Sequence, residues 1–344
     1  MLLFSPVSRA GLGLLLLLAQ VAPAAARVLT LTKQGDTAAI VQDAITGASV
    51  ANAVSSPQDR LFVEGNALAA DVDHDLVYVA TLPDPAGAAS GTAHPLLVGA
   101  YGSALVPSGS MQAPAGRYFS ALAFDAPSSS VVGLVSDPTG ATASQVFVVP
   151  TNGGTAFGVP GYMAAAPDCC SLVRGVAAWR ASTRELFAVG RRTGDIEDQL
   201  LRFDVGTAAA LPDAYPIAGD RVVALAVDAL DGSVYALARS VLDFTYLVRI
   251  TYTTAGTPVT LSAIGSAPAA CCYVASGPAT IDGIDAARAL YALTRDAQAP
   301  AAMQLSRFDF ASGNPTVVNA AVEGYGLWTD MDAALDRIFA DGFD

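Results

Sequence analysis

The stretch AVDALDGSVY, residues 226–235, decides the fold. It begins with small and apolar residues, reaches the acid Asp228 and passes through an Asp-Gly-Ser sequence to Val234 and Tyr235. Aspartate and glycine favour tight turns, the first by bonding nearby backbone N–H groups. β-branched and aromatic residues favour strands. The stretch therefore predicts a β-hairpin whose turn begins at Asp228.

The same pattern occurs six times along the chain. Arg180 replaces the acid in the third copy, and the fifth copy is one residue shorter. The marker positions are separated by 54, 55, 48, 57 and 47 residues, close to the length of a propeller blade of four strands. The copies are Asp71 with Val77-Tyr78, Asp125 with Val131-Val132, Arg180 with Leu186-Phe187, Asp228 with Val234-Tyr235, Asp285 with Leu290-Tyr291, and Asp332 with Ile338-Phe339.

A second pattern follows about 15 residues after several of the hairpins and supplies further strands. It occurs at residues 201–204, 247–250 and 305–309, and glycine-containing turns and valine-rich runs come next. Four antiparallel strands in each unit is the arrangement of a propeller blade. The sequence thus predicts an all-β, six-bladed β-propeller over residues 27–344, as a single domain. Two stacked sandwich domains are the alternative.

The two ends of the mature chain predict how the ring closes. The last hairpin finishes at Phe339, five residues before the C-terminus, which leaves its blade without outer strands. Residues 27–31 and 37–41, joined by a Gly35-Asp36 turn, match the third and fourth strands of a blade. We expect these N-terminal strands to complete the blade that begins near Asp332. A ring closed in this way has no open seam.

The hairpin motif resembles the inner strands of six-bladed propellers of the low-density-lipoprotein-receptor and NHL kind. Ala226-Val227-Asp228 with Val234-Tyr235 carries the likeness best, and it extends to all six copies. The resemblance implies the architecture alone. The Trp-Thr-Asp sequence that follows the tyrosine in the receptor family is replaced here by residues 236–238, Ala-Leu-Ala. The ligand recognition of that family is therefore not carried over.

The first 26 residues predict a cleaved signal peptide. A single positive charge, Arg9, precedes the apolar run of residues 14–19, and residues 23–26 offer small side chains to a signal peptidase. The run is too short to span a bilayer. Export to the periplasm or the medium is expected, and residues 336–344 look like a short tail of exported proteins from some Gram-negative bacteria.

The charge of the chain excludes two classes of partner. The whole chain carries a net charge of −13, and removal of the leader with Arg9 makes it −14. Nucleic acids and anionic membranes are bound through lysine and arginine, and Lys33 is the single lysine. We expect a monomer that binds an unidentified protein or small-molecule ligand. No cofactor, nucleic acid or membrane insertion is indicated.

Two pairs of adjacent cysteines are the most distinctive candidates for a site. Cys169-Cys170 and Cys271-Cys272 each precede a predicted inner strand, on loops that share one face. An oxidising compartment favours disulfides, although neighbouring Cα atoms, about 3.8 Å apart, lie closer than a disulfide usually allows. Structural disulfides, ligand-contacting strained disulfides and a metal or redox role all stay open.

The remaining candidates are weaker. Residues 71–75, Asp-Val-Asp-His-Asp, alternate acids as a Ca²⁺ loop can, but the glycine and the distant glutamate of an EF-hand loop are missing, so a solvated hairpin tip is expected instead. The same expectation holds for the similar residues 194–198. His74 and His94 are expected at the surface. Trp179, Trp328, Tyr101, Tyr118 and Tyr162 either line a ligand site or pack in the core, and core packing is expected for the two tryptophans.

No convergent catalytic set is visible in the sequence. A Ser-His-acid triad needs a histidine, and the two histidines of the chain, His74 and His94, are expected at the surface. The G-x-S-x-G elbow of the α/β-hydrolases is also absent. We therefore expect an exported binding or interaction protein. The alternative is a metal-dependent hydrolase or lactonase with acids and asparagines on the propeller axis.

Overall fold

The structure is a computed structural model. It describes residues 28–34, 38–43, 45, 49–55, 60–62, 68–71, 73–83, 94–114, 116–136, 144–151, 157–158, 170–192, 194–206, 212–241, 244–265, 277–282, 288–295, 303–319 and 324–329. The predicted leader, residues 1–26, lies outside the described residues. Within them, we find no helix with the length and hydrophobicity that a bilayer span requires.

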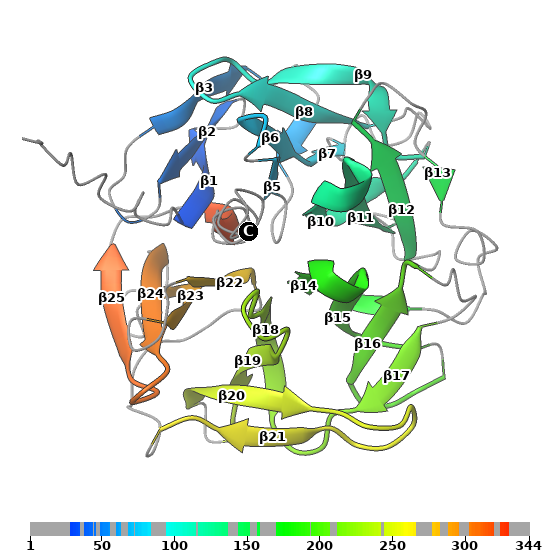
Figure 1. Cartoon of the computed structure of the whole chain (residues 1–344), viewed down its shortest axis with the longest axis vertical. Coiled ribbons are helices and arrows are strands. Elements are labelled where there is room, and N and C mark those ends of the chain that lie inside the picture. Colours follow the sequence, from blue (N-terminus) through cyan, green and yellow to red (C-terminus); the bar gives the residue numbers. More distant parts are fainter. Residues whose placement is uncertain are drawn as a thin grey trace, which may run out of the picture.

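Six four-stranded antiparallel sheets are arranged around a central axis (Figure 1). The prediction of a β-propeller with four-stranded antiparallel blades is confirmed. From the innermost strand outward the first three sheets in chain order are β5 (Leu68–Asp71), β6 (Leu76–Val79), β8 (Pro95–Ala100) and β9 (Val106–Gln112); β10 (Tyr118–Asp125), β11 (Ser130–Ser136), β12 (Gln145–Pro150) and β13 (Phe157–Gly158); and β14 (Ser171–Arg180), β15 (Glu185–Arg191), β16 (Gln199–Asp204) and β17 (Asp213–Pro216).

The remaining sheets follow the same order. Each is named below by its innermost strand. They are β18 (Arg221–Val227), β19 (Val234–Arg239), β20 (Thr245–Thr251) and β21 (Thr260–Ala263); β22 (Ala279–Asp282), β23 (Ala289–Arg295), β24 (Met303–Asp309) and β25 (Pro315–Asn319); and β26 (Gly324–Thr329), β1 (Val28–Gln34), β2 (Ala38–Asp43) and β3 (Ser49–Ser55). A two-stranded sheet, β4 (Arg60–Phe62) with β7 (Thr81–Pro83), completes the described strands.

The two ends of the chain lie edge to edge, as the sequence predicts. β1 pairs antiparallel with β26, with Val28 opposite Thr329 and Leu29 opposite Trp328. The division of strands differs from the prediction, because β1 is the second strand of this sheet and not the third. Val28 and Leu29 are fully buried, as a strand between two others requires. The N-terminal segment therefore supplies three strands and β26 supplies one, while residues 330–344, with Asp332 and Phe339, lie outside the described residues.

The hydrophobic core lies between neighbouring sheets. One cluster joins Ala69 and Tyr78 of the β5 sheet to Phe119 and Leu122 of β10. Another joins Phe187 of β15 to Leu225 of β18. Alanine recurs on the innermost strands because these strands approach one another most closely around the axis. Each sheet thus buries both of its faces against its two neighbours.

The hairpin turns that follow the innermost strands repeat one backbone geometry. The residue four positions after the marker adopts a left-handed conformation in four copies, with φ values of 53° at Asp75, 46° at Ser129, 55° at Arg184 and 68° at Gly232. The η2 (Ala126–Ser128) and η3 (Ala181–Thr183) turns are two of these connections. The sequence repeat is therefore a repeat of turn structure.

In the fifth hairpin the acid is not the one that the sequence predicted. β22 ends at Asp282, which lies opposite Ala289, as Asp71 ends β5 opposite Leu76. Asp282 is buried, whereas Asp285 lies outside the described residues. Six residues separate Asp282 from Ala289, whereas four separate Asp71 from Leu76 and Asp125 from Ser130, so counting back from Leu290-Tyr291 selected the wrong acid.

Connections between third and fourth strands cover the outer edge of the preceding sheet. Gly256 donates its N–H to the Ala214 carbonyl (2.8 Å), and Val259 donates to Pro216 (2.9 Å), so the β20–β21 connection lies along β17. A Cβ added to Gly265 would lie 1.8 Å from the Ser312 carbonyl oxygen. The outer edge of β17 is thus in contact with the next sheet, as is the chain just beyond β21.

Ring closure can be tested with an engineered disulfide between Thr30 and Leu327, which lie opposite each other on β1 and β26. Opposed Cα atoms in antiparallel strands are about 4.5–5.5 Å apart, within disulfide range. We expect Thr30→Cys with Leu327→Cys to form the cross-link and to raise the free energy of unfolding by roughly 2–4 kcal/mol. Peptide mapping without reductant measures the bond. A folded double variant with both new thiols free would contradict the pairing.

Candidate functional site

Antiparallel pairing gives the molecule two distinct faces. The turns that follow the innermost strands form the turn face, which includes residues 73–75, 126–129, 181–184 and 229–233. The opposite ends of the sheets form the link face, where the chain enters each innermost strand and where second strands connect to third strands. Ser171, the first residue of β14, lies opposite Arg191, the last residue of β15. Cys170 therefore lies on the link face.

Cys170 is the one predicted disulfide candidate within the described residues. It is buried and belongs to an apolar cluster with Val146 of the β10 sheet and Leu201 of its own sheet. No cysteine in the described part of the chain is a free thiol. Cys169, Cys271 and Cys272 lie outside the described residues, so their placement stays a prediction.

Three innermost strands, β10, β14 and β18, are bulged next to the link face. In β10 one extra residue, Ser120, stands between Phe119 and Ala121, and in β18 the extra residue is Val223. In β14 four residues, 173–176, face the single residue Val189. Bulges redirect side chains and occur often beside functional sites. The bulges in β10 and β18 could not be predicted from the sequence, because no glycine or proline marks them.

The bulges are held by hydrogen bonds within and between sheets. The Ser120 hydroxyl lies 2.8 Å from that of Ser136, which lies 2.9 Å from that of Ser144. All three serines are buried. The Val223 carbonyl accepts the N–H of Gly277, just before β22. The bulged region is consequently a fixed part of the scaffold.

Two loops of the link face carry exposed side chains on a fixed base. Residues 192–198 join β15 to β16, and their base is held by the Arg191–Asp198 ion pair (3.0 Å). Residues 240–244 join β19 to β20. Nearby, the Tyr246 hydroxyl donates to Asp220. Burial, with this hydrogen bond and the charge of Asp220, raises the pKa of Tyr246 to about 12.

Two of the repeated acids of the turn face form ion pairs between sheets. Asp125, which is fully buried, contacts Arg184 of the next sheet at 2.9 Å. Asp228 contacts Arg288 of the next sheet at 2.7 Å. Both arginines stand directly before the second strand of their sheet. Burial raises the pKa of Asp228, opposed by the Leu230 N–H and by Arg288.

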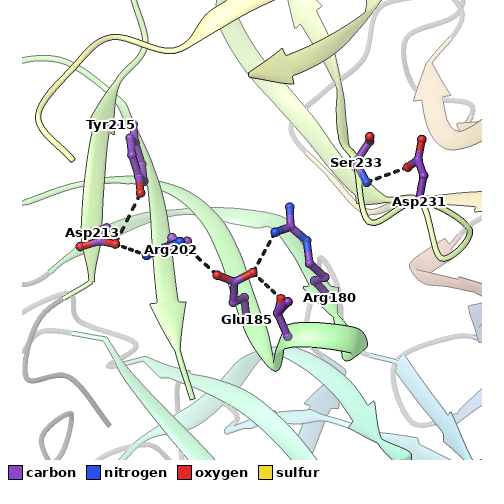
Figure 2. Close-up of polar contacts among 8 residues, drawn as sticks. Arg180, Glu185, Arg202, Asp213, Tyr215, Asp231 and Ser233 are labelled. Atoms are coloured by element: carbon purple, nitrogen blue, oxygen red, sulfur yellow. Dashed lines mark hydrogen bonds and ion pairs between the residues drawn. The ribbon is translucent and has the colours of Figure 1, made fainter. Parts of the chain in front are cut away.

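In the third hairpin, where Arg180 replaces the acid, another polar network takes its place (Figure 2). Glu185 is almost buried and accepts hydrogen bonds from Arg180 (2.8 Å) and from Thr183. Arg202 lies 3.1 Å from Glu185 and also pairs with Asp213. Two arginines therefore share one buried carboxylate, and all three residues belong to the same sheet, unlike the pairs of Asp125 and Asp228.

Arginines of these networks also pack on aromatic rings. The Arg180 guanidinium lies 4.8 Å from the Phe187 ring centre and 6.0 Å from that of Tyr252 in the next sheet. Arg288 lies 4.9 Å from the Phe310 ring and 6.0 Å from Tyr235 in the preceding sheet. Cation–π contacts of this kind stabilise partly desolvated arginines. The turn-face arginines thus connect sheets through both charge and packing.

The proposed Ca²⁺ loop does not form a cluster in the part of the chain that is described. Asp71 is buried and its carboxylate lies 2.8 Å from Nδ1 of His74. Asp73, His74 and Asp75 are exposed at the hairpin tip. Within the described ranges, no three His, Cys, Asp or Glu side chains lie close enough to share a metal ion. The exposed residues 73–75 agree with a solvated hairpin tip.

The other candidates have different outcomes. His74 is exposed, but His94 is buried, so the expectation of a surface position was wrong for His94. Trp179 is half-buried and packs against an apolar cluster between sheets, which agrees with the prediction of core packing. Tyr118 is buried and Tyr101 is half-buried against another cluster. Tyr162 lies outside the described residues, as does the side chain of Trp328.

The inter-sheet ion pair predicts an asymmetric effect of mutation. Arg184→Met leaves the Asp125 carboxylate fully buried beside an apolar side chain, and we expect a loss of about 3 kcal/mol or more in the free energy of unfolding. The double variant with Asp125→Asn should regain most of it. Arg191→Met, which breaks an exposed pair with Asp198, should cost at most about 1 kcal/mol. Urea unfolding measures all three; equal losses for the single and double variants would contradict the ion-pair role.

Alkaline unfolding should depend on Tyr78. Burial, with the charge of Asp71, raises the pKa of Tyr78 to about 12, above the value of about 10 in the unfolded chain. The stabilisation that the folded state gains from this difference in pKa is complete below pH 10 and is lost as the pH rises from 10 to 12. Tyr78→Phe should remove roughly 1–3 kcal/mol of the pH dependence in that window, measured by unfolding at a series of pH values. An unchanged profile would contradict this assignment.

Comparison with known proteins gives no family for the chain. No protein-family model matches it, and no curated protein matches it. Similar solved structures include a prolyl endopeptidase (16% identity, TM-score 0.44, covering 88% of this chain and 40% of that chain). They also include the Kuenenia stuttgartiensis hydrazine synthase (10%, 0.47, 83% and 90%) and a putative 6-phosphogluconolactonase from Bacteroides uniformis (17%, 0.43, 87% and 83%). This chain spans less than half of the prolyl endopeptidase, and none of these likenesses assigns it a function.

Proposed function

We propose that the protein is an exported six-bladed β-propeller that binds a partner through its link face. The observation that carries the proposal is the division of roles between the two faces. On the turn face, Asp125, Asp228 and Glu185 are buried and bonded to arginines. On the link face, loops with fixed bases carry exposed side chains. The turn face therefore joins the sheets, and the link face is available to a partner.

The count of six blades rests on the six four-stranded sheets. The sixth blade is the β26 sheet, which both ends of the chain share. The mixed origin of this sheet stabilises the ring because opening it would separate β1 from β26. A closed ring of this kind is a rigid platform for loops, which suits recognition.

Export and disulfide formation belong to the same proposal. The basic residue, apolar run and small residues of the first 26 positions support passage into an oxidising compartment. We assign Cys170 to a disulfide with Cys169, Cys271 or Cys272, because no described cysteine is a free thiol. Such a bond would hold a link-face loop in place.

The proposal is tested on the protein exported with its own leader. We expect affinity purification after mild chemical cross-linking in the producing cell to yield a specific partner. Chelation with EDTA should change neither thermal stability nor any hydrolysis of a lactone panel. A stoichiometric metal ion, measured by mass spectrometry, whose removal abolishes lactone hydrolysis would overturn the proposal in favour of a metal-dependent hydrolase.

A further inference from the structure

Two apolar side chains of the link face are almost fully exposed. Ile196 is 87% exposed and Val241 is 88% exposed. The other exposed large apolar side chains of the described residues, Val106, Val317 and Leu230, are 39% to 58% exposed. A single exposed apolar residue needs no explanation. These two, however, occupy equivalent loops of adjacent sheets, between the second and third strands of each.

The chain segment that joins the two sheets places both loops on the same face. Ile217, just after β17, donates its N–H to the carbonyl of Asp198 in the first loop. Asp220, just before β18, accepts from Tyr246, which follows the second loop. Residues 217–220 therefore contact both loop ends, with Ile196 on one side and Val241 on the other.

Both loops are held at their bases by hydrogen bonds. The Asp195 N–H donates to the Arg192 carbonyl (3.0 Å), and the Gln199 amide donates to the Asp195 carboxylate (2.5 Å). In the second loop, Ser240 donates its N–H to the Phe244 carbonyl (2.9 Å), and its hydroxyl accepts the N–H of Phe244 (3.2 Å). Hydrogen bonds at the loop bases reduce the conformational entropy that the described residues of the loops lose on binding.

The charges around Ile196 indicate which partner fits. Ile196 lies between Asp195 and Glu197 at the tip of the loop, and Asp198 follows. The positively charged Arg191 and Arg192 lie at the start of the loop. Asp195 and Glu197 are exposed. Because Arg191 pairs with Asp198, the negative rim around Ile196 consists of Asp195 and Glu197, on a chain whose net charge is −13. Complementary charge favours a positive surface on the partner.

We propose that Ile196 and Val241 are a two-point contact for a protein whose surface has apolar pockets bordered by lysine or arginine. This inference rests on the proposed function and names the part of the link face that performs it. Burial of each side chain in a pocket corresponds to about 10- to 100-fold in Kd. The negative rim makes association weaken as the salt concentration rises.

Site-specific photo-cross-linking in the producing cell tests this contact. A benzophenone amino acid replaces Ile196, Val241 or, on the turn face, Leu230 in separate variants. We expect the first two positions to cross-link the same protein at a segment rich in lysine or arginine, identified by mass spectrometry. The Leu230 position should not cross-link that protein.

The outcomes separate this inference from the proposed function. Cross-linking from Leu230 alone would overturn both the contact and the choice of face, while binding itself would stand. Cross-linking from no position, together with a failed affinity purification, would overturn the proposed function as well. Cross-linking to a second copy of this chain, or to a segment without basic residues, would overturn the partner chemistry.

A quantitative measurement follows with the identified partner. Ile196→Ser and Val241→Ser should each weaken binding by about 10- to 100-fold, and Leu230→Ser should leave it unchanged. All three side chains are exposed, so the variants should fold as the parent does, which thermal unfolding checks. Unchanged Kd values for the two link-face variants would overturn the contact.

Discussion

The pairing of β1 with β26 is the constraint on which the rest of the structure depends. Every sheet has two apolar faces, and each face is covered by a neighbouring sheet. A linear row of such sheets would leave one face uncovered at each end. Because β1 joins β26 in one sheet, the row becomes a ring and no terminal sheet remains. The full burial of Val28 and Leu29 shows that the N-terminal strand belongs to this core.

The acid–arginine pairs add specificity to what is otherwise apolar packing. Ala and Val surfaces fit together in many registers, because they are small and similar in shape. A buried carboxylate needs its arginine at one place, and its desolvation is compensated only there. Asp125 with Arg184 and Asp228 with Arg288 therefore fix how one sheet sits on the next. In the hairpin of Arg180 the ion pairs of Glu185 stay within one sheet, and it is the Arg180 guanidinium that reaches the next sheet, at the Tyr252 ring.

The repeat in the sequence was sufficient to predict the propeller and its closure, because the hairpin turn has a strict local chemistry. Asp228 and its counterparts precede a left-handed residue in the same position of each turn. The partners of these acids could not be predicted, since Arg184 and Arg288 come from another sheet and lie about 60 residues away. The bulges were missed because they depend on packing around the axis. The N-terminal segment supplies three strands of the closing sheet and β26 supplies one. This division was not predicted because β1 is apolar enough to be either the second or the third strand of a sheet.

The contacts that cover the outer edge of β17 have a consequence for behaviour at high concentration. An exposed strand edge can add a strand from another molecule and so begin a fibril. Here the Gly256 N–H bonds to the carbonyl of Ala214 on β17, and the backbone at Ser312 lies against Gly265 beyond β21. The edge of β17 is thus occupied by the molecule's own chain, so another molecule cannot add a strand there.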